Sequence, residues 1–208
     1  KAVRAFTKPF NDAGIQTHML DRGLNGLRMY PVPADVRRLM YKVKHAQGVD
    51  ITRIFCGLNE VRNIIPSIHY ALEGGMIPQA TLCITFSPVH TVEYYTAIAD
   101  KLIEAGAPEI CLKDMAGVGR PVMLGRLTKA IKERHPEVLI QYHGHSGPGL
   151  SMASILEVCE NGADIIDVAM EPISWGKVHP DVISVQAMLK DAGFRVPEIN
   201  MKAYMKAR

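Results

Sequence analysis

Short apolar runs alternate along the chain with longer stretches in which apolar residues recur at helical spacing. Each short run is followed by Gly, Pro, Asn or Asp, which end strands, and each long stretch stops at a glycine or a proline. The pattern predicts six strands, over residues 15–20, 51–58, 79–87, 109–117, 139–145 and 163–170. It predicts helices over residues 1–12, 35–47, 61–73, 91–105, 121–134, 150–160 and 181–192.

One predicted helix, over residues 35–47, carries a clear apolar stripe. Val36, Leu39, Met40 and Val43 stand at positions i, i+3, i+4 and i+7. Side chains at this spacing share one face of a helix, so we expect this stripe to be buried.

The recurring strand–helix units predict the fold class, α/β. Six units, spaced about 30 residues apart, predict a parallel sheet with helical crossovers, either an open doubly wound sheet or part of a TIM (β/α)8 barrel. No Gly-x-Gly-x-x-Gly follows a strand and no Gly-x-x-x-x-Gly-Lys-Ser/Thr is present, which disfavours the nucleotide-binding open sheets. We therefore predict one domain over residues 1–208, a partial barrel with about six of its eight units, and expect the other two before Lys1.

Composition excludes several classes of partner. The 24 Lys and Arg residues exceed the 21 Asp and Glu residues by only three and are spread along the chain, so no nucleic-acid surface is predicted. The four cysteines are far apart and include no Cys-x-x-Cys pair, which argues against a disulfide framework and favours the reducing cytoplasm. No apolar run approaches the ~18–20 residues of a membrane span.

The strongest chemical signal is the pair His143 and His145 at the end of the fifth predicted strand. Alternate side chains of a strand share a face, so the two imidazoles point the same way and can converge on one cation. The alternative is a polar strand end that happens to carry two histidines. Since the carboxyl ends of barrel strands meet at one mouth, the other polar residues at such ends are also candidates. They are Arg22, Asn25, Cys56, Asn59, Thr85, His90, Lys113, Asp114, Glu171 and Ser174.

Two of these candidates carry specific hypotheses. Lys113 lies in an apolar strand, where burial favours the neutral amine; such an amine can react with carbon dioxide to give a carbamate ligand. The alternative is an ion pair with Asp114 or a neighbouring strand. Arg22 suits a bidentate hold on a substrate carboxylate, with a surface ion pair as the alternative.

Four segments together resemble a known family. They are Asp21-Arg-Gly-Leu-Asn25, Thr85-Phe-Ser-Pro-Val-His-Thr91, Leu112-Lys-Asp-Met-Ala-Gly117 and Tyr142-His-Gly-His-Ser-Gly-Pro-Gly149. In this order they resemble the carboxyltransferase domain of biotin-dependent enzymes, such as oxaloacetate decarboxylase, transcarboxylase and pyruvate carboxylase, within the HMG-CoA-lyase-like superfamily. The resemblance covers nearly the whole chain.

The resemblance implies carboxyl transfer or decarboxylation on a small 2-oxo acid, pyruvate or oxaloacetate, through a metal-stabilised enolate. It implies a divalent metal (Zn, Mn or Co) on His143, His145 and a carbamylated Lys113, and a keto acid bound by Arg22 with Asn25 and Asn59 as further contacts. It also implies biotin on a partner carboxyl carrier domain, and a homo-oligomer when complete.

The chain departs from the family at several points. No counterpart of the family's metal-binding aspartate, in an Arg-Asp-x-x-Gln segment, precedes Asp21, and Lys177 stands near the position of a proton-handling threonine. We expect the domain to lack the family's C-terminal extension and its biotin-carrier domain, since neither follows Arg208 in this sequence. The alternatives are a metal-dependent lyase or aldolase of the same superfamily, whose members usually have a small residue in place of Lys113, and an inactive fragment.

Overall fold

The computed structural model describes residues 1–208, and its six strands form one sheet in which they follow one another in chain order. The order runs from β1 to β6 without reversal, and the pairs β1–β2, β2–β3 and β5–β6 are parallel. A doubly wound sheet reverses its strand order at a switch point, whereas a β/α barrel does not. The strands are β1 (His18–Asp21), β2 (Ile51–Ile54), β3 (Ile77–Cys83), β4 (Glu109–Asp114), β5 (Leu139–Gly144) and β6 (Ile165–Ile166).

The helices connect these strands at the predicted places. They are α1 (Ala2–Asp12), α2 (Ala34–Ala46), α3 (Val61–Glu73), α4 (Val92–Glu104), α5 (Pro121–Arg134), α6 (Ser151–Glu160), α7 (Val182–Asp191) and α8 (Met201–Ala207), with a 3-10 turn η1 (Gly23–Asn25). Local chemistry fixes several starts: Pro121 opens α5, and the side chains of Asp181 and Asn200 cap α7 and α8. Only α8 was not predicted. None of the helices has the length and apolarity that crossing a membrane requires.

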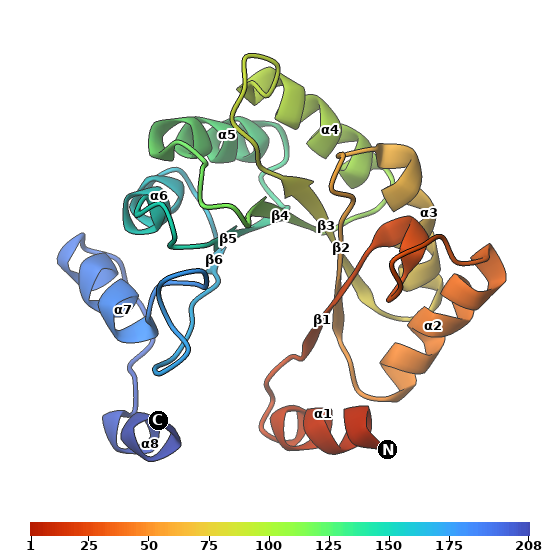
Figure 1. Ribbon diagram of the computed structural model, residues 1–208, viewed down its shortest axis with the longest axis horizontal. Helices are drawn as coiled ribbons and strands as arrows, with labels where there is room; N and C mark the ends of the chain where they lie inside the picture. Colours follow the sequence, from red (N-terminus) through yellow and green to blue (C-terminus); the bar gives the residue numbers. More distant parts are fainter. The chain divides into compact units, whose positions relative to one another are not determined.

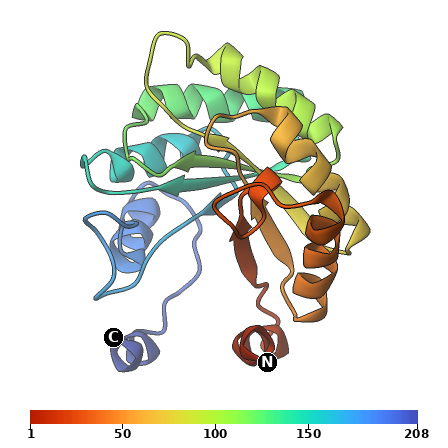
Figure 2. The same ribbon diagram turned by 45° about the vertical axis from the view of Figure 1, so that its right-hand side comes forward.

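The chain divides into two compact units. The first comprises residues 1–83, 93–111 and 137–139, and the second comprises residues 84–92, 112–136 and 140–208. In the first unit α2 packs beside α3, and α3 covers β2 and β3 (Figure 1). In the second unit α5 and α6 lie side by side, as both views show (Figure 2). Each unit thus has neighbouring helices packed beside one another, as helical crossovers between adjacent parallel strands produce.

The predicted faces of α3 and α5 contribute to the core. On α5 the predicted inward residues Leu124, Leu127 and Ile131 are completely buried. On α3 Ile64 and Ile68 are completely buried, but Leu72 at the end of the same face is 45% exposed.

The predicted stripe on α2 was wrong. Val36, Leu39 and Val43 are 50%, 60% and 48% exposed, and the buried residues of the helix are instead Arg37, Tyr41 and Lys44. These three also recur at helical spacing, but apolarity does not mark them. They can be buried because each has a polar partner. Arg37 Nη1 lies 3.3 Å from Ser67 Oγ, and Tyr41 and Lys44 bond to Asp21.

Several strands are shorter than predicted. β1 begins at His18 instead of residue 15, β2 ends at Ile54, and β6 contains only two residues. Beyond β6 the chain pairs with a later part of itself: Ala169 N donates to Pro180 O at 2.9 Å, and Val182 N donates to Ala169 O at 2.9 Å. Since the backbone groups of Ala169 are satisfied by this returning segment, the apolar run to Met170 does not extend the sheet.

Candidate functional site

Three histidines of the second unit lie together at the end of β5. His143 Nε2 is 3.2 Å from His145 Nε2, and the ring of His179 lies with its centroid 4.3 Å from that of His143 and 5.0 Å from that of His145. One ring nitrogen from each residue falls within 4.8 Å of the others. We call these three residues the histidine cluster.

Each ring of the histidine cluster is held by a hydrogen-bond acceptor. Asp167 Oδ2 lies 2.6 Å from His143 Nδ1, and Gly144 O lies 2.9 Å from His179 Nδ1. The backbone of Lys177 bonds to the third ring, that of His145. Such bonds fix the orientation and the tautomer of an imidazole, which is what metal-binding histidines need.

Burial favours the neutral form of one member of the cluster. It lowers the pKa of His145, and the nearby His179 and the positive charge of Lys113 act in the same direction, against the bond to Lys177. Neutral imidazole is the form that binds a metal ion.

Lys113 and Asp114, at the end of β4, both interact with His145 of the cluster. Lys113 is 5% exposed and lies close enough to His145 for its charge to lower that pKa. Asp114 accepts hydrogen bonds at 2.9 Å from the backbone N–H groups of Val118 and Gly119, while its carbonyl accepts one at 3.0 Å from His145 N. Burial raises the pKa of the Asp114 carboxyl, and these backbone bonds oppose the rise. Asp114 thus organises the turn after β4 and the entry to the histidine loop.

In the first unit, Arg22 and Asn25 line a cavity of about 400 Å³ that Leu24, Met29, Phe55, Cys56, Gly57 and Asn63 complete. Arg22 Nη1 donates to Arg28 O at 3.2 Å and also contacts the sulfur of Met29. Its guanidinium is exposed, so it has donors to offer a ligand in this cavity.

Unlike Arg22, Asn59 has a side chain whose polar atoms are bonded to the backbone of another residue. Its side-chain amide donates to Cys83 O at 2.9 Å and its side-chain oxygen accepts from Cys83 N at 2.7 Å, so the residue joins the loop between β2 and α3 to the end of β3. Its φ of 54° is one that asparagine tolerates better than most residues.

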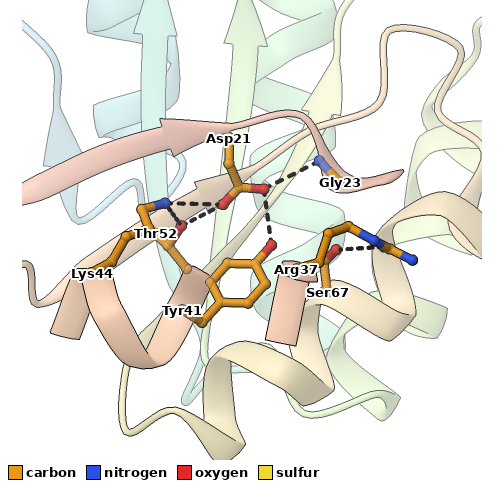
Figure 3. Close-up of polar contacts among 7 residues, drawn as sticks. All are labelled: Asp21, Gly23, Arg37, Tyr41, Lys44, Thr52 and Ser67. Atoms are coloured by element: carbon orange, nitrogen blue, oxygen red, sulfur yellow. Dashed lines mark hydrogen bonds and ion pairs between the residues drawn. The ribbon is translucent and has the colours of Figure 1, made fainter. Parts of the chain in front are cut away.

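A buried polar network lies directly before Arg22 (Figure 3). Asp21 Oδ2 is 3.3 Å from Lys44 Nζ and also contacts Thr52 Oγ1. Asp21 Oδ1 accepts from Tyr41 OH at 3.0 Å and from Gly23 N at 3.2 Å. Burial raises the pKa of Asp21 and lowers that of Lys44, although each charge favours the other. The bond to Gly23 fixes the turn on which Arg22 sits.

The pattern of the sequence pointed to His143, His145 and Lys113, and the structure brings the charge of Lys113 and the two rings close together. It did not point to His179 or Asp167. Neither is part of a periodic pattern, and His179 lies 34 residues beyond His145 in the loop that precedes α7. The only sequence feature that could have indicated His179 was a histidine in a polar loop after the sixth predicted strand.

Comparison with known proteins identifies the family. A model of the HMGL-like family matches residues 67–205. The chain belongs to the HMGL-like family. It is 36% identical over 212 residues to a pyruvate carboxylase subunit of Methanocaldococcus jannaschii, covering 99% of this chain and 37% of that protein. It is 34% identical to the methylmalonyl-CoA carboxyltransferase 5S subunit of Propionibacterium freudenreichii subsp. shermanii, covering 92% of this chain and 38% of that one.

Solved structures agree. The carboxyl transferase domain of Rhizobium etli pyruvate carboxylase with pyruvate and biocytin superposes with a TM-score of 0.85 at 30% identity, covering 90% of this chain and 32% of that chain. The same domain with pyruvate gives a TM-score of 0.82 at 31% identity, covering 85% and 31%. The predicted resemblance and the predicted partial β/α barrel are therefore confirmed. The chain spans less than two fifths of the length of these relatives.

Proposed function

We propose that this chain is the carboxyltransferase domain of a biotin-dependent enzyme that acts on a small 2-oxo acid, pyruvate or oxaloacetate. Carbon dioxide would pass between biotin and the enolate of the 2-oxo acid. The observation that carries the proposal is the convergence of His143 and His145 beside the charge of Lys113, in a chain whose relatives include a pyruvate carboxylase subunit and a carboxyltransferase subunit.

The residues fit a divalent cation. His143 and His145 would each bind it through one ring nitrogen, and the separate bonds to Asp167 and to the Lys177 backbone already fix the two rings. Lys113 would bind as the carbamate that a neutral amine forms with carbon dioxide, releasing a proton. The cation would supply Lewis-acid stabilisation of negative charge on the 2-oxo oxygen. Nitrogen and oxygen donors suit zinc, manganese or cobalt.

The first unit would contribute substrate binding. Arg22 is proposed to hold the substrate carboxylate, because its exposed guanidinium lines a cavity together with Asn25. Asn59 is proposed to be a further substrate contact, in the loop between β2 and α3, where the bonds to Cys83 restrict its side chain.

The proposal includes partners and a compartment. Biotin would be carried by a separate carboxyl carrier domain or subunit. The domain itself would cover residues 1–208 and act within a homo-oligomer. Cytoplasmic location is favoured by four cysteines that are all free.

The test measures oxaloacetate decarboxylation by the full-length enzyme with and without free biotin. Lys113→Ala and His145→Ala are expected to lower the biotin-dependent rate by about 10²–10³, the usual effect of losing one electrostatic contact to the developing charge. Arg22→Ala should raise KM as well as lower kcat. Lys129→Ala and His69→Ala, exposed residues of α5 and α3, are matched controls that should retain the wild-type rate.

Two results would overturn the proposal. Decarboxylation that does not depend on biotin, or a Lys113→Ala enzyme at the wild-type rate, would exclude the carboxyltransferase. Biotin-independent cleavage of a carbon–carbon bond that releases no carbon dioxide would instead favour a metal-dependent lyase or aldolase of the same superfamily.

A further inference from the structure

We propose that Asp21 is a positioning residue for substrate binding, whose buried carboxylate fixes the turn from which Arg22 reaches the substrate. The inference rests on the proposed function, in which Arg22 holds the carboxylate of the 2-oxo acid. It gives a role to a buried charged group that the proposed mechanism does not use. Asp21 acts through the backbone of Gly23 and does not touch the substrate.

Asp21 and Arg22 are neighbours in the sequence with opposite surroundings. Asp21 is 1% exposed and lies beneath α2, whose Tyr41 and Lys44 bond to its carboxylate. Arg22 is exposed and lines the cavity of about 400 Å³. The carboxylate therefore has no access to a ligand in the cavity and can influence one only through neighbouring residues.

The backbone N–H of Gly23 makes the connection. It donates to Asp21 Oδ1 at 3.2 Å, so this bond closes over Arg22 from one side to the other (Figure 3). Arg22 N donates to Gly26 O at 2.8 Å, and Gly26 N donates to Gly23 O at 3.1 Å. Gly23 has a φ of 49°, and a Cβ added there would lie 2.6 Å from Asn63 O. The turn thus packs closely against α3, and the bond to Asp21 holds it there.

The guanidinium of Arg22 depends on the same turn. Its Nη1 donates to Arg28 O at 3.2 Å, and Arg28 N donates to Asn25 O at 3.0 Å. Asp21 is also bonded to a second part of the cavity lining, because its carbonyl accepts from Phe55 N at 3.2 Å. A change in the turn would therefore move the guanidinium relative to the rest of the cavity.

The carboxylate that holds the turn is itself held. An exposed aspartate often accepts a bond from the backbone two residues further on, and it can rotate away. Here Tyr41 OH donates to Oδ1 at 3.0 Å, while Lys44 Nζ, at 3.3 Å, and Thr52 Oγ1 bond to Oδ2. Each oxygen has its own donors in a site without water, so the carboxylate has one orientation and offers Gly23 an acceptor in a fixed position.

The test compares two double variants of the full-length protein that both lack the buried charges. Asp21→Asn/Lys44→Met keeps an oxygen that can accept from Gly23 N, whereas Asp21→Leu/Lys44→Met has none. Pyruvate binding is measured by titration calorimetry. We expect the leucine pair to bind pyruvate at least about 10-fold more weakly, within the ~100-fold that a 1 Å misplacement can cost, and the asparagine pair to restore most of the affinity. The amides of residues 22–26 should exchange hydrogen faster in the leucine pair.

Controls separate positioning from a loss of stability. Leu102→Ala, in the completely buried part of α4, should cost about 2–5 kcal/mol and leave pyruvate affinity unchanged. Asp21→Ala/Lys44→Met also lacks the acceptor and avoids the bulk of leucine, so it replaces the leucine pair if that variant does not fold. In the Arg22→Ala background the leucine pair should cause no further loss, because the residue through which Asp21 acts is already gone.

The outcomes separate this inference from the proposed function. Wild-type affinity in the leucine pair, while Arg22→Ala weakens binding, would overturn the positioning role alone. Equal losses in the two pairs, equal hydrogen exchange at residues 22–26, or a further loss in the Arg22→Ala background would overturn it as well. Unchanged pyruvate affinity in Arg22→Ala would instead refute the proposed substrate contact, and this inference with it.

Discussion

The buried ion pair of Asp21 and Lys44 makes a quantitative prediction about stability. Their side chains are 0% and 5% exposed, and Lys44→Met leaves Asp21 without the positive charge that opposes its desolvation. Removing one partner of a buried pair typically costs about 3–5 kcal/mol, a large part of the ~5–15 kcal/mol by which domains are stable. On the same helix, Lys42 pairs with Glu73 at the surface, so Lys42→Met should cost less than about 1 kcal/mol.

The cost should depend on pH with a definite sign. Burial already raises the pKa of Asp21, and loss of Lys44 removes an influence that lowers it, so the pKa rises further in the variant. A carboxyl whose folded pKa exceeds its unfolded pKa, about 3.9, stabilises the fold fully below that value and loses this contribution as pH rises through the folded pKa. Lys44→Met should therefore be less destabilising at pH 5 than at pH 8.

The assay is equilibrium unfolding by urea at pH 5 and pH 8 for the wild type, Lys44→Met, Lys42→Met and the double variant Asp21→Asn/Lys44→Met. The double variant has no buried charge and retains an oxygen for Tyr41 and Gly23, so it should recover most of the lost stability. If Lys44→Met costs no more than Lys42→Met, or if its cost is the same at both pH values, Asp21 is not a buried charge held by Lys44.

Two further predictions concern the second unit. Asp167→Asn should lower the affinity of the histidine cluster for Co²⁺ by about 10–100-fold, because the amide is a weaker acceptor for His143 Nδ1; unchanged affinity in a direct titration would contradict this. Gly117→Ala should lower the melting temperature, because φ is 68° and an added Cβ would lie 2.5 Å from His145 O; a melting temperature equal to the wild type, measured by calorimetry, would show that the turn relaxes freely.

The local sequence pattern was sufficient to predict most of the strands and helices and their order along the chain. Apolar runs that end in Gly, Pro or Asn stop where the structure stops them or within a few residues, and Pro121 opens α5 as its fixed φ and missing N–H dictate. Alternation along a strand brings His143 and His145 close together, with their Nε2 atoms 3.2 Å apart. These features depend on residues near one another in the chain, so the sequence alone determines them.

Two features depended on tertiary contacts between residues far apart in the chain, the buried face of α2 and the position of His179. α2 buries Tyr41 and Lys44 in place of Val36 and Leu39, because Asp21, about twenty residues earlier, needs donors in an environment without water. His179 joins the histidine cluster only because the loop before α7 returns to Ser146 and Ala169. The alternating pattern could identify two imidazoles on one strand, but a third from another segment is brought to them by backbone hydrogen bonds that leave no periodic trace in the sequence.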